Sequence, residues 1–178
     1  MRDDPNIFTD PPDRLGAADF YFGTFVVGIG GMEGIEVARA FAEAADRLLT
    51  AAAQQRESWE AAYPILYCYR HALELHLKAL LPSPKHGHRL ADLAEAIKPA
   101  LQRYPPKQVA WLLERIAEFD RLDPKSTVFR YPDGHQTSYK PGAEPDPEMW
   151  VDFRKLQRTA NRVFQGLERV RLHQHSTE

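Results

Sequence analysis

The stretch YRHALELHLKALLPSPKHGHRL, residues 69–90, joins a helical pattern to an abrupt break. Apolar side chains recur at three- and four-residue spacing along its first half, as on one face of an α-helix. The segment PSPKHG, residues 82–87, then ends the pattern, because proline removes a backbone donor and glycine favours turns. The stretch therefore predicts a helix that ends near Leu81 and another that begins near His88.

The same periodicity extends through most of the chain. We expect helices over residues 33–55, 59–81, 88–101, 105–123 and 147–172. Pro64 falls in or near a first turn and Pro106 suits a first-turn position, where proline is tolerated, whereas Pro99 is expected to kink or end its helix. Connections of short or medium length favour antiparallel neighbours. The predicted fold class is therefore all-α, an antiparallel helical bundle of about five helices.

Three segments lie outside this pattern. Residues 1–34 predict an irregular N-terminal extension ahead of a bundle over 35–172, and residues 173–178 predict a fraying tail. We do not expect the run FYFGTFVVGIGGMEG to form a dinucleotide-binding turn, because its glycines miss the required spacing and no second strand is predicted to follow. Residues 124–147 predict one long connection rich in proline and glycine, in which STVFRY, residues 126–131, is expected as a short strand.

Composition restricts the class of protein. With 43% hydrophobic and 27% charged residues over 178 positions, the chain predicts an ordinary globular domain with a substantial core. The single cysteine, Cys68, excludes a disulfide or a thiolate metal site within one chain, and the acidic, proline-containing start does not resemble an export signal. No apolar run approaches the roughly 20 residues that cross a bilayer. We therefore expect a soluble cytoplasmic protein with no membrane partner.

Charge is distributed unevenly along the chain. Residues 1–50 hold four Lys or Arg against nine Asp or Glu, a net −5, which leaves +3 for the remainder of a chain whose formal charge is −2. This asymmetry permits RNA or another polyanion as a local ligand of the helical part without requiring one.

The passage between the second and third expected helices has a distinct pattern. It contains A-x-E-x-x-LKALL over residues 72–81 and H-x-L-x-x-L over residues 88–93. This passage resembles the second-to-third helix passage of HEPN domains, the all-α domains of prokaryotic toxins, defence proteins and nucleotidyltransferase partners. The later segment DRLDPKSTVFRYPDG is similar to HEPN-like bacterial proteins, which extends the resemblance to about residues 36–170. The resemblance implies a helical bundle that often dimerises and, in many members, a metal-independent ribonuclease.

Active HEPN ribonucleases carry an arginine, usually followed by a polar residue, and a histidine four to six residues further on. Arg70, His71 and His76 match that pattern. The resemblance implies that His76 transfers the proton during attack by a ribose 2′-hydroxyl, while Arg70 holds the phosphorane charge through its planar fork. His71, Glu74 and Lys78 are the expected supporting residues.

Helix geometry adds a requirement to this hypothesis. Arg70 and His76 lie roughly 120° apart around a helix and about 9 Å apart along it, so one helix cannot easily direct both at one phosphate. A two-fold axis can place each motif beside its copy, and the ribonuclease hypothesis therefore needs a homodimer. The Arg-to-His spacing also occurs at Arg130–His135 and Arg169–His175. Arg130 is a candidate phosphate contact, or a partner for a carboxylate.

A structural interpretation of the same side chains stays open. Arg70, Glu74 and Lys78, spaced i, i+4 and i+8, also predict a solvated salt-bridge ladder worth about 0.2–0.5 kcal/mol per pair. His76 is alternatively a histidine at the edge of the core, bonded to a carbonyl or to water. His71 is alternatively solvated on the polar side of the helix.

The remaining candidates are weaker. His86 and His88 form an H-x-H pair, but no acidic or thiolate partner is fixed nearby, so we predict no metal and no cofactor. His88 has a structural alternative at the start of its helix. Phe129 and Tyr131 are expected to anchor the long connection on the bundle.

Three functions follow as hypotheses. The first is an endoribonuclease of toxin or antiviral-defence type, acting on RNA as a homodimer. The second is a non-catalytic helical binding or dimerisation module for a second protein, such as a nucleotidyltransferase or a defence component encoded nearby. The third is a small-ligand or nucleotide binder with a pocket between the bundle and the connection at 123–146.

Overall fold

The computed structural model describes residues 33–55, 59–82, 87–130 and 150–176. Helices occupy most of these residues and no strand occurs among them, so the predicted all-α class is confirmed. The residues from Glu33 onward belong to one compact unit. None of the helices in the described ranges is long and apolar enough to span a bilayer.

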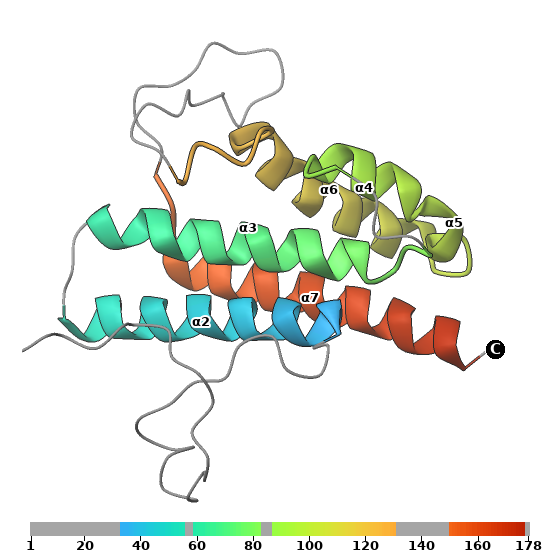
Figure 1. Ribbon diagram of the computed structural model, residues 1–178, viewed down its shortest axis with the longest axis horizontal. Coiled ribbons are helices and arrows are strands. Elements are labelled where there is room, and N and C mark those ends of the chain that lie inside the picture. Colours follow the sequence, from blue (N-terminus) through green and yellow to red (C-terminus); the bar gives the residue numbers. More distant parts are fainter. Residues whose placement is uncertain (1–32, 56–58, 83–86, 131–149, 177–178) are drawn as a thin grey trace, which may run out of the picture. The chain divides into compact units, whose positions relative to one another are not determined.

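Six α-helices and one short 3-10 helix make up the described part of the chain (Figure 1). They are α2 (Gly34–Gln55), η1 (Trp59–Ala61), α3 (Ala62–Lys78), α4 (Leu90–Ala96), α5 (Lys98–Leu101), α6 (Pro106–Leu122) and α7 (Phe153–His175). The helices expected at 33–55, 59–81 and 105–123 are confirmed, with small differences at their ends.

Proline positions explain where several helices begin or break. Pro64 lies in the first turn of α3 and Pro106 is the first residue of α6, where the missing N–H has no helical partner to lose. Pro99 lies in the first turn of α5. The single helix expected from His88 to Leu101 is therefore divided into α4 and α5.

The last helix differs from its expected bounds. Residues 147–149 lie outside the described residues, and α7 begins only after Asp152, whose carboxylate caps it by accepting a backbone N–H of the first turn. Trp150, which the pattern assigned to the buried face of this helix, precedes the helix and is 91% exposed. At the other end, α7 continues through His175, beyond the expected end at Leu172.

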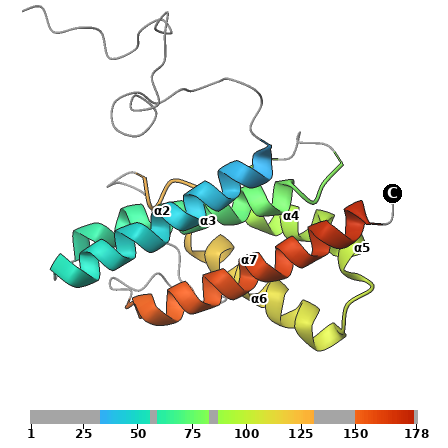
Figure 2. The same ribbon diagram turned by 90° about the horizontal axis from the view of Figure 1, so that it is seen from below.

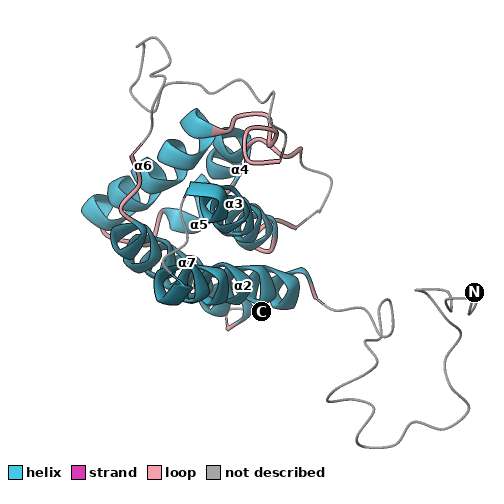
Figure 3. Ribbon diagram, turned by 90° about the vertical axis from the view of Figure 1, so that its left-hand side faces the viewer, coloured by secondary structure: helices cyan, strands magenta, loops and turns pink. Residues whose placement is uncertain are grey.

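The central helix of the bundle is α3. Figure 3 shows α2 and α7 on one side of it and α4 and α6 on the other. The helices α2 and α3 lie side by side and run in opposite directions (Figure 1), and α7 lies beside α6 in the view from below (Figure 2). Because other helices enclose α3, it buries polar side chains as well as apolar ones. Its buried residues are Ile65, Leu66, Tyr69, Arg70, Ala72, Leu73, Glu74, His76 and Leu77.

The apolar core receives side chains from each layer. Each fully buried leucine or isoleucine contributes about 1.5–3 kcal/mol relative to leaving it in water. The most deeply buried members, beside those of α3, are Leu90, Leu93, Ile97, Leu101, Ile116 and Leu167. A polar contact also joins the layers, because Asp46 of α2 accepts hydrogen bonds from Tyr69 of α3 at 2.5 Å and from Gln157 of α7 at 2.9 Å.

The segment after α6 forms turns and not the expected strand. Asp123 initiates them, because its Oδ1 accepts the backbone N–H groups of Thr127 and Val128 at 2.7 and 3.1 Å. Phe129 and Val128 pack against Leu66 in a small apolar cluster, which confirms Phe129 as an anchor. Tyr131 lies outside the described residues.

Candidate functional site

Arg70 lies at the junction of α3, the start of α4 and the turns after α6, and its exposed fraction is 0%. Its Nε donates to the backbone oxygen of Asp123 at 3.1 Å. Its terminal nitrogens donate to Glu74 Oε2 at 3.1 Å, Ser126 Oγ at 3.0 Å and the His88 carbonyl at 2.9 Å. The guanidinium therefore joins three parts of its own chain and has no surface on which to receive a ligand.

Glu74 completes this group, and we name Arg70, Glu74, His88, Asp123 and Ser126 the Arg70 network. All of them are buried except His88, whose side chain is 76% exposed. Glu74 Oε1 accepts from Lys78 Nζ at 2.8 Å and lies 2.7 Å from His88 Nδ1. Burial by itself raises the pKa of Glu74, but the hydrogen bonds from Lys78 and His88 outweigh it and hold the pKa below its ordinary value.

The i, i+4 ion pairs that the sequence predicts therefore exist, but the prediction of a solvated ladder is wrong. Arg70 and Glu74 are both buried, and the Lys78 side chain is only 18% exposed. The reason is that α4 and the turns after α6 cover this face of α3, which the pattern of one helix does not reveal. His88 confirms its structural role at the start of α4, since its carbonyl and its ring both belong to the network.

The turns after α6 provide the other half of the network. Asp123 is fully buried, and its Oδ2 lies 3.4 Å from Arg70 Nε. Ser126 adopts φ = 59°, a left-handed conformation that is unfavourable for a residue with a Cβ. The fold retains this strained turn, and the turn places Ser126 Oγ against Arg70.

His76 lies in a different environment. Its Nδ1 donates to the Ala72 carbonyl at 2.8 Å, its ring stacks on Phe164 at 4.8 Å, and its Nε2 lies 3.9 Å from Glu168 Oε1. Burial lowers the pKa of His76, although the hydrogen bond to Ala72 opposes the shift. The interpretation as a core-edge histidine bonded to a carbonyl is confirmed.

The structure does not bring Arg70 and His76 together within one chain. Arg70 is directed toward α4 and the turns after α6, whereas His76 contacts α7. Their environments are separate, and a second copy cannot reach the Arg70 guanidinium without opening the network around it.

His71 is not solvated as its position on the helical wheel predicts. Its ring meets the Phe41 ring edge-to-face at 4.4 Å and stacks on Tyr67 at 5.8 Å. Burial lowers its pKa. The prediction of a solvated histidine is wrong because α2, which carries Phe41, covers this part of α3.

Arg130 binds its own turn. Its Nε donates to the Ser126 carbonyl at 2.5 Å, and its guanidinium lies 5.9 Å from the centroid of the Tyr67 ring. A phosphate contact by Arg130 stays a prediction. His135 and His86, from the alternative motif and the H-x-H pair, lie outside the described residues, and the described ones contain no group of three or more metal-ligating side chains.

An open cleft of about 610 Å³ lies beside His76. It is lined by Arg39, Ala42, His76, Asn161, Phe164, Gln165, Glu168 and Arg169. Glu168 accepts from Arg39 at 2.8 Å and from Arg171 at 3.1 Å. Burial raises the pKa of Glu168, but these two hydrogen bonds outweigh it and lower the pKa, so the cleft holds an ionised carboxylate next to His76.

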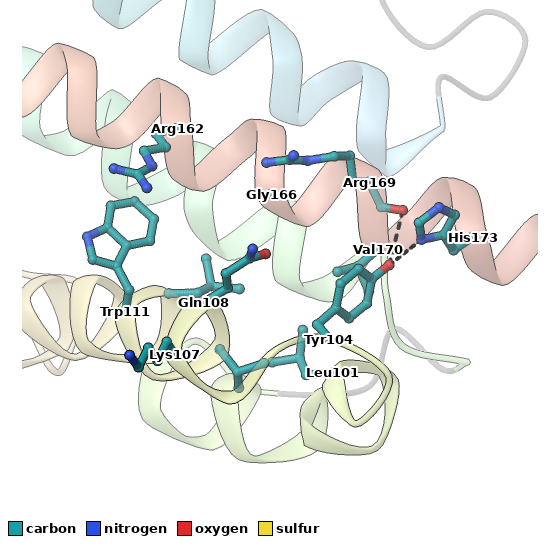
Figure 4. A pocket seen from close by; sticks show the side chains of 12 residues that line it. Leu101, Tyr104, Lys107, Gln108, Trp111, Arg162, Gly166, Arg169, Val170 and His173 are labelled. Atoms are coloured by element: carbon teal, nitrogen blue, oxygen red, sulfur yellow. Dashed lines mark hydrogen bonds between the residues drawn. The ribbon is translucent and has the colours of Figure 1, made fainter.

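A second cavity, of about 630 Å³, lies between α6 and α7, and we name it the cationic cavity (Figure 4). Positive side chains and the two rings Tyr104 and Trp111 surround an apolar floor, and no Asp or Glu of the described segments lines it. The lining residues are Leu101, Tyr104, Lys107, Gln108, Val109, Trp111, Leu112, Arg162, Gly166, Arg169, Val170 and His173.

Aromatic contacts fix both ends of the cationic cavity. The Arg162 guanidinium lies 4.4 Å from the centroid of the Trp111 ring at one end. At the other end Tyr104 and His173 stack at 5.8 Å, and the Tyr104 hydroxyl lies 2.5 Å from His173 Nδ1. Figure 4 shows Arg162 and Arg169 on α7, with Lys107 of α6 across the cavity from them.

Sequence reasoning missed this cavity, because it treated the apolar spacing along the last helix as a core stripe and its end as a fraying tail. The sequence does contain a signal of this cavity. Arg162 and Arg169 lie seven residues apart and share a helix face with Gly166, Val170 and His173. Both arginines are exposed, so the signal is a pair of cations that flank a residue without a side chain on one helix face.

Comparison with protein-family models, with curated proteins and with solved structures finds no match to this chain. The resemblance to HEPN domains stays a prediction.

Proposed function

We propose that this domain works by binding a second protein chain and that Arg70 and His76 are structural residues. The observation that carries the proposal is the Arg70 network, in which the guanidinium is 0% exposed and donates to four acceptors of its own chain. A phosphate ligand would have to displace these acceptors, and breaking a buried charge pair costs about 3–5 kcal/mol. A HEPN-like bundle without a usable motif fits a binding or dimerisation module.

Incubation of RNA with the purified chain in EDTA tests the structural role of His76. We expect no cleavage that depends on His76. The comparison uses His76→Ala with His175→Ala as the matched exposed histidine of α7, and circular dichroism verifies that both fold. Cleavage that disappears in His76→Ala and persists in His175→Ala contradicts this part of the proposal.

Light scattering on the chain isolated from its native host tests the partner. We expect a particle heavier than the 20.4 kDa monomer, with either a second copy or a different chain in stoichiometric amount. Recovery as a bare monomer over a wide range of concentration contradicts a binding module.

A metal-independent ribonuclease of toxin or defence type is the second candidate, and one observation favours it. His76 lines the open cleft together with Arg39 and Arg169, and a lowered pKa keeps its imidazole in the neutral form that a general base requires. In this version Arg169 replaces Arg70 as the residue that stabilises the phosphorane. Cleavage in EDTA that is lost in both His76→Ala and Arg169→Ala supports this candidate, and cleavage unchanged in both excludes it.

A further inference from the structure

We infer that the cationic cavity binds a nucleoside phosphate, a ligand that joins a planar base to a phosphate group. The inference does not depend on the second chain proposed above, because it concerns a cavity within one chain. The first observation is the positive charge of the residues that line the cavity. Lys107, Arg162 and Arg169 line the cavity together with His173, and no carboxylate of the described residues lines it, although the whole chain has a formal charge of −2.

Three of these side chains, Lys107, Arg162 and Arg169, are not neutralised by the parts of the chain that the structure describes. No carboxylate in these parts forms an ion pair with Lys107, Arg162 or Arg169. Arg169 Nε donates to the Gln165 carbonyl of its own helix at 3.3 Å, which uses one donor of a guanidinium that has several more. Phosphate oxygens match this donor geometry, because they accept charge-assisted and often bidentate hydrogen bonds from arginine.

The aromatic rings indicate what accompanies the phosphate. Trp111 already carries the Arg162 guanidinium on its ring, and Tyr104 stacks with His173 at the opposite end of the cavity (Figure 4). Nucleobases stack on such rings and on guanidinium planes without strong preference among the bases. The apolar floor of Leu101 and Val170 offers contact surface for a base or a sugar.

Size distinguishes a nucleotide from a simple anion. The volume of about 630 Å³ falls in the range of about 300–1,000 Å³ that is usual for small-molecule sites. Inorganic phosphate would leave the apolar floor and the rings without contacts. A nucleoside without phosphate would leave the cations without a counter-charge.

Isothermal titration calorimetry of the full chain with AMP, adenosine and inorganic phosphate tests the inference. We expect AMP to saturate one site at low salt, with an affinity that falls as NaCl is added. Adenosine and phosphate should each bind at least about tenfold more weakly. Arg169→Gln should weaken AMP by about tenfold or more, whereas Arg158→Gln, the matched exposed arginine of α7, should not.

Gly166 provides a second test that removes no charge. A Cβ at this position would meet only Leu112 Cδ1, at 3.9 Å, so Gly166→Ala fits and should retain AMP binding. Gly166→Leu extends into the cavity and should abolish binding while circular dichroism shows a folded chain. Equal affinity of AMP for the wild type and Gly166→Leu overturns the inference. So does tighter binding of phosphate than of AMP, or binding of single-stranded RNA without any binding of AMP.

Discussion

The Arg70 network and the cationic cavity hold their arginines in opposite conditions. Arg70 is enclosed and faces the carboxylates of Glu74 and Asp123, whereas Arg162 and Arg169 are exposed and line a cavity to which none of the described carboxylates contributes. A buried charge that its own chain neutralises stabilises the fold. A group of charges that the described chain leaves without counter-charge is better explained by a ligand. The motif that first draws attention in the sequence is therefore assigned a structural role, and the cavity is where we propose a small ligand.

Truncation of an arginine should lower the free energy of unfolding most when the arginine belongs to the Arg70 network. Arg70→Ala leaves Asp123 buried without its cation and Glu74 with Lys78 as its remaining one, and we expect the free energy of unfolding to fall by about 3–5 kcal/mol. Arg169→Ala in the cavity should change it by less than about 1 kcal/mol. Urea denaturation of both variants measures the difference. Equal losses would remove the distinction between the two regions.

The second largest difference between the two regions is expected in how the stability of their variants depends on pH. The pKa of Glu74 is lowered in the fold, so its contribution is fully present above its ordinary value of 4.5 and is lost as pH falls through the folded value. We expect Glu74→Gln to cost about 1.5–3 kcal/mol at neutral pH, with a cost that shrinks below about pH 4. Lys107→Gln in the cavity should show no such pH dependence. Urea titrations at several pH values test this, and a constant cost for Glu74→Gln contradicts it.

A smaller effect should reveal the strain in the turn that completes the network. Ser126→Ala and Ser126→Gly both remove the hydroxyl that accepts from Arg70, but only alanine retains a Cβ at φ = 59°. We expect the glycine variant to be more stable than the alanine variant by about 1 kcal/mol. Thermal unfolding of the pair measures it, and an alanine variant that is equally stable would show that the turn is not strained.

The smallest change in the free energy of unfolding is expected at the cationic cavity, and it is an increase. Gly166→Ala adds a methyl group in ordinary contact with Leu112 and improves helix propensity, so we expect a gain of about 0.5–1 kcal/mol. Calorimetric unfolding of the variant tests this. A loss of stability would show that the wall of the cavity is already tightly packed.

The fold was largely predictable from local pattern. The helices around Ala38, Leu73 and Ile116 follow from apolar spacing. The break near Pro99 follows because the proline ring fixes φ and removes a backbone N–H donor. Two predictions, that Trp150 is buried on the last helix and that a strand follows α6, were wrong for a shared reason. Their positions depend on side-chain caps from Asp152 and Asp123, whose competition with helix or strand cannot be weighed from spacing alone.

For the Arg70 network, the sequence predicted which residues of one helix can pair, but not their burial or their partners from other segments. The sequence shows that Arg70, Glu74 and Lys78 lie within bonding distance along one helix, and the ion pairs are present. It does not show that His88 and Ser126, from later segments, enclose the same guanidinium. Helical wheels assign a face to solvent by default, and that default fails for a central helix that neighbours cover on several sides.

By itself, the sequence determined the class of fold, because the 3.6-residue period and the proline breaks act over a few neighbouring residues. Only the tertiary structure decided which charges are buried and paired within the chain and which are exposed without a carboxylate partner among the described residues. Burial and ion pairing depend on segments far apart along the chain, such as Arg70 with Asp123 or Trp111 with Arg162, and no local pattern carries that information.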